Sequence, residues 1–547
     1  MTPSDFHLQI HPHQNTLLSM AHHLSNTAID IPSTGKLHQG GPSQHLKYAP
    51  SLSMSFQLSN TRPNGNRLST TLVHHLDDDS LLVVFSFCRP VILDESEADN
   101  WRILGGGEWI RERWWYALIR VCRRWRYLIL ESAYHLQASL VCVRGTLVAD
   151  MLLHSPPIPL IIDHFDEYQD LSAEDQEGVI LALQHRDRVR RIRLVNPVPI
   201  LQKLIAALEG EFPVLEHMYV RDHRNEERTS TIEHITNLRL PESFRAPHLR
   251  RLVLTNFAFP IESPSLTTTV NLVTLSLNDI PPSTYFHPDA LLEHLLLMPQ
   301  LETLGIGFNR HNPSRDVEME LLRTPITTPI TLPNLRWLGF GGTCAYSEAL
   351  LSWVTAPLLE RLQVCLSDGT IYSIPRLRQF MSTAHNLRFK TVTFTFFEEW
   401  LQVAAYPHEG AKLVTLHMEL GGRHLDWQVI SAAHVFQALK TVFSPVDHLG
   451  IEYSRHNISS EWNNEADNIH WREFIGSFGN VKTLFVDGEL VRQLSRALHP
   501  GEEESPTELL PKLQRLSYSA IGTSPDAFTP FIDARQKAGR PVTVIHP

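Results

Sequence analysis

One pattern of apolar residues recurs from about residue 185 to the end of the chain. An apolar residue is followed by two others, a second apolar residue, one other, and a third apolar residue. The alternation that ends each copy predicts a short strand with one buried face. Clear copies begin at Leu249, Leu272, Leu301, Leu335 and Leu359, and less regular ones begin at Phe389, Leu413, Val446, Val481 and Leu513.

The segments between these copies predict helices. In "HPDALLEHLLLMPQLETLGI", Pro288 suits a first helical position and Pro299 ends the helix. In "SEALLSWVTAPLLERLQV", Ser347 and Pro357 are expected to act as cap and stop. Helices and strands that alternate in one sense give parallel strands with helices on the outside.

The unit length of roughly 23 to 35 residues resembles that of leucine-rich repeats. We therefore expect an α/β fold, with a small helical bundle followed by an irregular solenoid of parallel strands and outer helices. The irregularity follows from Phe257 and Ile280, which stand where such repeats usually carry Asn or Cys. A doubly wound α/β enzyme is the alternative, but the sequence has no glycine-rich phosphate loop after a strand.

Composition limits the function classes. Apolar residues make up 42% of the chain and charged residues 20%, and the net charge of −11 is spread along it, which argues against a nucleic-acid partner. No apolar run reaches the roughly 20 residues that span a bilayer, so we expect a protein of the cytoplasm or nucleus without a membrane partner. The five cysteines show no metal-type spacing, and we expect neither a metal site nor a cofactor.

Residues 1–70 are rich in His, Ser, Asn, Pro and Gln and predict a disordered tail. Order begins at "LVHHLDDDSLLVVFSFC", where residues 77–79 supply a helix cap and an apolar face follows. A loop at residues 89–113 leads to "WWYALIRVCRRWRYLIL", which we expect to form one helix from Trp114 to Leu130. Apolar residues lie on one side of that helix and four arginines on the other.

These two helical stretches resemble the F-box, a bundle of about three short helices. The residues that match its first helix are Leu76, Asp79, Leu81, Val84, Phe85 and Ser86, and those that match its closing element are Val121, Cys122, Arg123, Arg124, Trp125 and Arg126. The chain departs from the motif where Asp77 replaces a proline and where the loop at 89–113 is unusually long.

The resemblance implies binding to a Skp-family adaptor and through it to a cullin. The side chains expected to contact the adaptor are Leu76, Leu81, Leu82, Val84, Phe85, Val121, Cys122 and Trp125. The protein would then be the non-catalytic substrate-recognition subunit of an SCF-type ubiquitin ligase, with an unidentified protein substrate. The alternative is a repeat scaffold without a ubiquitin role, in which the helices only cap the solenoid.

The expected domains are a tail (1–70), an F-box-like module (71–135), a connector (136–184) and a solenoid with a C-terminal cap (185–547). Strand alternation directs the residues between the leucines to the face without helices. The partner-binding side chains expected there are Trp337, Arg361, His448, Phe485 and Arg515. The alternative for this face is that the loops of the protein cover it.

Overall fold

A computed structural model describes part of the chain, in two compact units. The described residues are 76–89, 113–165, 171–222, 238–263, 266, 268–308, 321, 329–367, 372–454, 466–499, 509–518 and 526–545. The first unit takes the described residues up to Val141 together with His154–Ile158, and the second takes Cys142–Leu153 and those from Pro159 onward. The predicted tail and residues 90–112 of the predicted loop lie outside the described residues.

The helices of the first unit are α2 (Asp78–Phe87), α4 (Trp114–Leu118) and α5 (Arg123–Glu131). The cap predicted for α2 is confirmed, because the Ser80 amide donates to Asp77 Oδ1 at 2.7 Å. Hydrogen bonding from Ser80 also lowers the pKa of the Asp77 carboxyl.

The prediction of a single helix from Trp114 to Leu130 is wrong, because the helix is interrupted between α4, which ends at Leu118, and α5, which begins at Arg123. Cys122 has extended backbone angles (φ −156°, ψ 170°), and its Sγ accepts a bond from the Trp125 amide at 3.5 Å, so it caps a new helix. Arg126 Nε donates to the Ile119 carbonyl at 3.1 Å across the break. No Pro or Gly marks this position, and the apolar spacing continues through it, which concealed the break.

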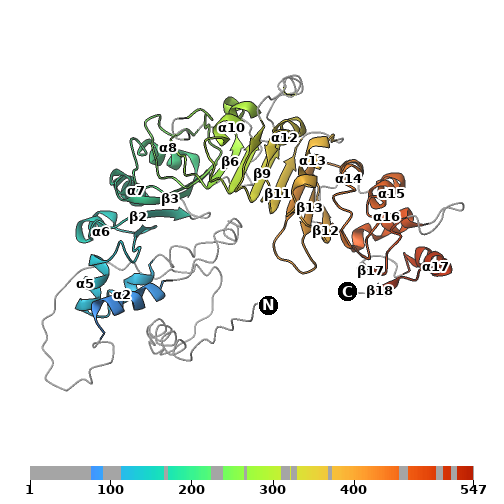
Figure 1. Cartoon of the computed structure of the whole chain (residues 1–547), viewed down its shortest axis with the longest axis horizontal. Coiled ribbons are helices and arrows are strands. Elements are labelled where there is room, and N and C mark those ends of the chain that lie inside the picture. The colour runs from blue at the N-terminus through green and yellow to red at the C-terminus, as the bar shows by residue number, and fades with distance from the viewer. Residues whose placement is uncertain are drawn as a thin grey trace, which may run out of the picture. The chain divides into compact units, whose positions relative to one another are not determined.

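One large sheet contains sixteen strands among the described residues (Figure 1). In chain order they are β1 (Leu140–Cys142), β2 (Leu160–Phe165), β3 (Val189–Asn196), β4 (His217–Asp222), β5 (Arg251–Thr255), β6 (Thr274–Ile280), β7 (Thr303–Phe308), β9 (Trp337–Gly342), β11 (Arg361–Leu366), β12 (Thr391–Phe396), β13 (Trp400–Tyr406), β14 (Leu416–Gly421), β15 (His448–Tyr453), β16 (Thr483–Val486), β17 (Arg515–Tyr518) and β18 (Thr543–Ile545). Two short strands, β8 (Ile330–Thr331) and β10 (Val354–Thr355), form a separate parallel pair.

Helices of the second unit follow one side of this sheet (Figure 1). They are α6 (Val148–His154), α7 (Ala173–Gln184), α8 (Val198–Ala206), the short 3-10 helix η3 (Pro282–Thr284), α10 (Pro288–Leu295), α12 (Cys344–Leu351), α13 (Pro375–Thr383), α14 (Leu425–Ala438), α15 (Asn468–Gly476), α16 (Gly488–Leu498) and α17 (Thr529–Lys537). Pro288 begins α10 as predicted. Ser347 does not cap α12; Thr343 does, and Ser347 is buried inside the helix.

The repeated apolar triplets form the core. The three leucines of the copy at Leu249, Leu252 and Leu254 are each 1% exposed, and the other clear copies are buried in the same way. Alternate residues of β11 and β12 are partly exposed, as the strand period requires. The fold is therefore the predicted α/β leucine-rich-repeat solenoid. None of its described helices has the length and apolar character needed to cross a membrane.

Strand order departs from prediction in the middle of the sheet. We expected every copy to stack parallel in chain order, but the order runs β11-β14-β13-β12-β15, with β13 antiparallel to both neighbours. Residues 397–399 join β12 to β13 and residues 407–415 join β13 to β14. A parallel crossover needs a dozen or more residues, so these short connections require antiparallel pairing.

The sheet also begins earlier than predicted. The segment expected as a connector, 136–184, contains β1, α6, β2 and α7, and β2 pairs in parallel with β3. The short apolar run of β2 does not follow the pattern of the later copies, so periodicity alone did not reveal it. At the other end, α17 and β18 form the predicted C-terminal helix and strand.

Candidate functional site

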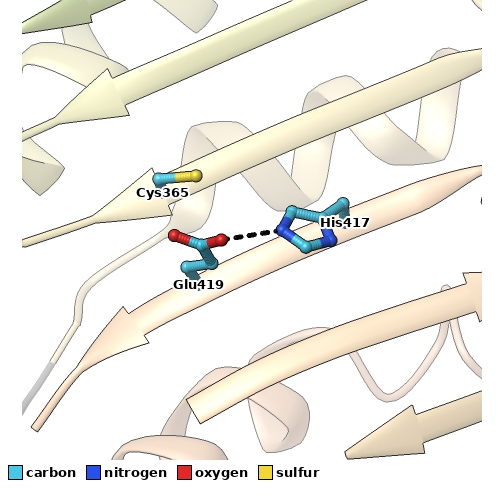
Figure 2. Close-up of side chains that lie close together, drawn as sticks. All are labelled: Cys365, His417 and Glu419. Carbon is cyan, nitrogen blue, oxygen red and sulfur yellow. Dashed lines mark hydrogen bonds and ion pairs between the residues drawn. The ribbon is translucent and has the colours of Figure 1, made fainter. Parts of the chain in front are cut away.

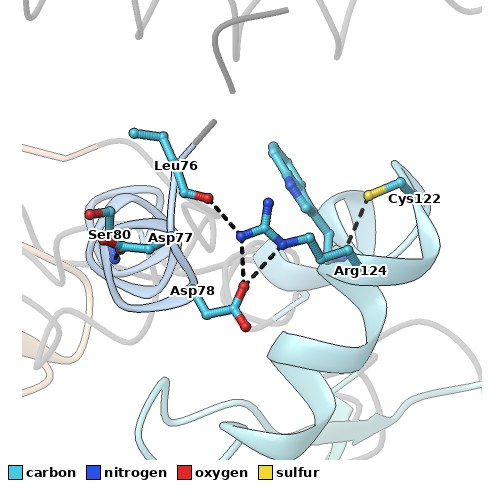
Figure 3. Close-up of polar contacts among 7 residues, drawn as sticks. Leu76, Asp77, Asp78, Ser80, Cys122 and Arg124 are labelled. Atoms are coloured by element: carbon cyan, nitrogen blue, oxygen red, sulfur yellow. Dashed lines mark hydrogen bonds and ion pairs between the residues drawn. The ribbon is translucent and has the colours of Figure 1, made fainter. Parts of the chain in front are cut away.

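An arginine clamp links α2 and α5 in the helical module (Figure 3). Arg124 Nη2 donates to Asp78 Oδ1 at 2.7 Å and to the Leu76 carbonyl at 2.6 Å, and its Nε donates to the same carboxylate oxygen at 3.0 Å. From the sequence we placed Arg124 only among the arginines on the side opposite the apolar residues. Instead it joins the start of α5 to the start of α2.

The apolar contacts between these helices centre on Trp125. Its ring meets Phe85 edge-on, with ring centroids 4.9 Å apart at 66°. Leu81 and Phe85 are fully buried. Trp115 is also buried, and its Nε1 donates to the Ser139 carbonyl at 3.2 Å. These contacts give the module a small core of its own.

The eight side chains expected to dock the adaptor therefore divide into three groups. Leu81 and Phe85 belong to the interior of the module, which corrects their placement on its surface. The half-buried members are Leu82, Val84, Cys122 and Trp125, and the exposed members are Leu76 and Val121. For the half-buried and the exposed members, contact with the adaptor remains a prediction.

Exposed apolar residues that we did not predict lie beside them. Phe87 is 78% exposed and Val83 is 56% exposed, and their spacing places them on one face of α2. Tyr127 on α5 is also exposed. The signal in the sequence was that "LLVVFSF" carries apolar residues on two faces of one helix, whereas a small module needs only one for its core.

The helix-free face of the large sheet carries the predicted partner residues. Trp337 pairs with Arg361, and Thr391, His448, Thr483 and Arg515 follow one another across β12, β15, β16 and β17. The predicted register is therefore confirmed within each of these two groups. The strands β13 and β14 separate the two groups.

The Trp337 ring lies close to neighbouring glycines. A Cβ atom built on Gly339 would lie 2.8 Å from Cζ2 of the indole ring and closer still to Cη2, and one on Gly305 would lie 3.1 Å from Cζ3. Real Cβ atoms do not approach as closely as the one on Gly339 would, so that position requires glycine for the ring to lie there, whereas the contact at Gly305 is only tight. Trp337 is only partly exposed as a result.

The other predicted partner residues differ in their surroundings. His448 Nε2 lies 3.4 Å from Asp447 Oδ1 and 3.5 Å from Glu409 Oε2. Arg515 is exposed, and its Nε donates to Thr483 Oγ1 at 3.1 Å. Phe485 is half-buried on β16. All three side chains are at least partly accessible on this face.

Arginines of β3 and β5 flank His217 of β4 on the same face, which composition did not reveal. Arg191, His217 and Arg251 are neighbours in register, and Arg193 lies two residues from Arg191 on the same face. Burial, followed by the charges of Arg191 and Arg251, lowers the pKa of His217 to about 3. The charge of Arg193 is partly balanced by Asp163, whose Oδ2 lies 3.7 Å from Arg193 Nη1.

A third feature of this face combines three metal-binding residue types. Cys365 on β11 and His417 and Glu419 on β14 hold their ligand atoms within 4.8 Å of one another (Figure 2). We expected no metal site because no spacing along the sequence suggested one. The cluster joins residues from different strands, and only the pairing of β11 with β14 brings them together.

Comparison with known proteins gives structural likeness alone. No protein-family model matches the sequence, and no curated protein matches it. The crystal structure of the TLR13–ssRNA13 complex is similar over 69% of this chain and 45% of that chain, with 14% identity and a TM-score of 0.29. The leucine-rich repeat-containing protein LegL7 from Legionella pneumophila is similar over 74% of this chain and 99% of that chain, with 12% identity and a TM-score of 0.22.

This chain thus spans less than half the length of the first of these proteins. The leucine-rich-repeat character of this protein follows from its own buried triplets, parallel strands and outer helices.

Proposed function

We propose that this protein is a non-catalytic receptor that joins two protein partners in the cytoplasm or nucleus. Its helical module docks a Skp-family adaptor, which leads to a cullin, and its repeat sheet binds a protein to be ubiquitinated. The proposal combines the F-box resemblance of residues 76–126 with the surface of the module.

The observation that carries the proposal is the exposed apolar set beside the F-box-like core. Val83 and Phe87 on α2, Val121 in the break and Tyr127 on α5 are each more than half exposed. Exposed apolar side chains of this size that gather on one small module favour a protein partner. The arginine clamp orders α2 and α5 without using any of them.

The helix-free face of the repeat sheet suits a protein substrate better than a nucleic acid. This face presents Trp337, Arg515 and Phe485 together with the carboxylates near His448. Aromatic residues and Arg are enriched in protein interfaces, and a nucleic-acid surface would carry one sign of charge throughout.

Co-purification of the full chain with a Skp-family adaptor tests the proposal. The double variant Val83→Asp with Phe87→Asp should abolish capture, because two charges would face an apolar partner. The matched control is Ile469→Asp, which alters a residue 61% exposed in the first turn of α15, where Asp is tolerated. Loss in the double variant alone supports adaptor docking.

Two outcomes would count against it. If the folded wild-type chain captures no adaptor, the scaffold without a ubiquitin role is favoured. If the double variant captures adaptor as well as the wild type does, then α2 is not the docking surface. Circular dichroism of both variants separates loss of binding from loss of folding.

A further inference from the structure

The cluster of Cys365, His417 and Glu419 lies where two strands are in register. Cys365 is directly opposite Glu419 across the β11–β14 pair, and His417 lies two residues before Glu419 on the same face. His417 Nε2 is 3.0 Å from Glu419 Oε1, and all three ligand atoms lie within 4.8 Å of one another. The sheet backbone fixes the three Cβ positions, so the grouping does not depend on a loop.

A hydrogen bond between side chains explains only part of this arrangement. It accounts for His417 and Glu419, but it gives no reason for a thiol on the adjacent strand. The thiol has a polar neighbour as well, since Gln363 Nε2 lies 3.7 Å from Cys365 Sγ. On the other side, β13 places the small Ala404 opposite His417.

We propose that Cys365 Sγ, His417 Nε2 and a Glu419 carboxylate oxygen bind a divalent ion of the zinc class. Thiolate, imidazole and carboxylate are the three ligand types that Zn²⁺ takes in proteins, at about 2.0–2.3 Å from the metal. Tetrahedral ligands at those lengths are about 3.5 Å apart. Small side-chain rotations would bring the three atoms from their present separations to that distance.

Zinc is favoured over harder cations by the donor set. Mg²⁺ and Ca²⁺ take oxygen ligands, whereas this cluster offers one sulfur and one nitrogen among three. The three residues are all partly exposed, so the fourth position of a tetrahedral ion would face solvent. An open fourth position is the arrangement in which a water molecule or an outside ligand completes the coordination.

This inference goes beyond the proposed receptor function and does not depend on adaptor docking. Binding would release the thiol proton and require a neutral imidazole, so the affinity should fall as the pH is lowered. The ion would also join β11 to β14 at the place where the strand order changes.

The test uses the purified full chain after treatment with a chelator. Titration with Zn²⁺ against a chromophoric chelator should give one tight equivalent. Co²⁺ should give a thiolate charge-transfer band and the visible bands of a tetrahedral ion. Cys365→Ser and His417→Ala should each raise the Kd more than about 100-fold, because loss of even an outer-shell partner costs 10- to 100-fold. Glu419→Gln should also weaken binding, without loss of the thiolate band.

The matched control is Cys88→Ser, which removes an exposed thiol from the end of α2. It should leave the titration and the cobalt spectrum unchanged. The proposal fails if the wild type binds no stoichiometric Zn²⁺. It also fails if the two ligand variants, shown to be folded by circular dichroism, bind as the wild type does, or if Cys88→Ser removes the thiolate band. Because these measurements use no adaptor, their result is independent of the co-purification.

Discussion

The helical module and the repeat sheet bury their apolar side chains to very different extents. In the repeat sheet the leucine triplets are almost completely removed from water, and aromatic rings fill the space between β12, α14 and α15. In the module, a few residues form the core while Phe87 and Val83 remain exposed. Each repeat covers its neighbour, whereas three short helices have no neighbour of the same kind.

The difference shows that the two units obtain their stability by different means. A repeat array gains from every interface between adjacent units. A small helical bundle buries little area, so polar contacts such as the Arg124 clamp and an outside partner matter more to it. Substitutions in the two units should therefore have unequal effects.

The largest effect is expected for Trp471→Ala in the repeat sheet. Trp471 is 0% exposed, its ring lies against Phe396 and Phe474, and its Nε1 donates to Gln493 Oε1 at 3.1 Å. Loss of a large buried aromatic should lower the free energy of unfolding by about 3–5 kcal/mol, measured by urea denaturation. Trp427→Ala removes a 43% exposed ring from α14 and should cost well under half of that; equal costs would show that α15 is not packed as described.

Trp125→Ala should have a smaller effect in the module, about 2–4 kcal/mol, because the ring is only half-buried. The loss of stability in the module is measured by the protection of the amides of α2 and α5 from hydrogen exchange. Tyr127→Ala, on the same helix but 65% exposed, should leave protection nearly unchanged. If the two variants lost the same protection, the face of α5 that packs on Phe85 would be misassigned.

Acid should weaken the repeat sheet through buried histidines. Burial lowers the pKa of His164 to about 4, from about 6.5 in the unfolded chain. Between these values the unfolded state binds a proton that the folded state does not, so stability falls as the pH drops below about 6.5 and levels off below about 4. The loss from His164 alone should be about 1–2 kcal/mol at pH 5.

His164→Leu tests this cause, because it removes the titrating group. The decline in unfolding free energy between pH 7 and pH 5 should become shallower by that amount, even if the substitution changes stability at pH 7. The control is His248→Leu, which alters an exposed histidine. An unchanged slope in His164→Leu would mean that other groups cause the acid sensitivity.

Gly339→Ala should cost about 1–2 kcal/mol, within the range for overpacking, because its methyl group would occupy the place of the Trp337 ring. The ring should move, and tryptophan fluorescence should report the change. Gly341→Ala provides a control on the same strand, since its Cβ would meet Gly307 Cα at an ordinary 3.5 Å. Equal costs at the two positions would argue that the ring does not lie over Gly339.

The smallest effect is expected for the clamp in the module. Arg124 and Asp78 have side chains 38% and 59% exposed, and pairs of this kind contribute up to about 1 kcal/mol. Arg124→Ala should lower amide protection at the start of α2 by that amount. Arg124→Lys keeps the charge but not the planar guanidinium group, so this variant should recover only part of the lost amide protection. Full recovery would mean that charge alone makes the contact.

Much of the fold could be predicted from the sequence because each leucine triplet reports directly on burial. The triplets identified the buried face and the registers that place Trp337 beside Arg361 and His448 beside Thr483. They could not give the order of β12, β13 and β14, because apolar alternation is the same in parallel and antiparallel strands. The short connections at residues 397–399 and 407–415 carry that information, because they are too short for parallel pairing.

The candidate sites were harder to predict because each depends on residues far apart in the chain. Cys365 is separated from His417 and Glu419 by a complete helix and two strands. Nothing in the sequence showed that the Trp337 ring would lie close to Gly305 and Gly339 of neighbouring positions in the sheet. In the module, the F-box resemblance identified Arg124 without indicating its contact with Asp78.

The reversed strand order has a consequence for folding as the chain is synthesised. The sheet can grow strand by strand from β2 to β11, because each new strand pairs with the one made before it. At β11 this growth stops, since its next neighbour, β14, is made only after β12 and β13. The edge of β11 therefore stays open while residues 367–415 emerge, and β12, which carries the same apolar triplet, arrives first. We therefore expect parallel pairing of β12 with β11 to be the non-native pairing that competes with the native order during translation.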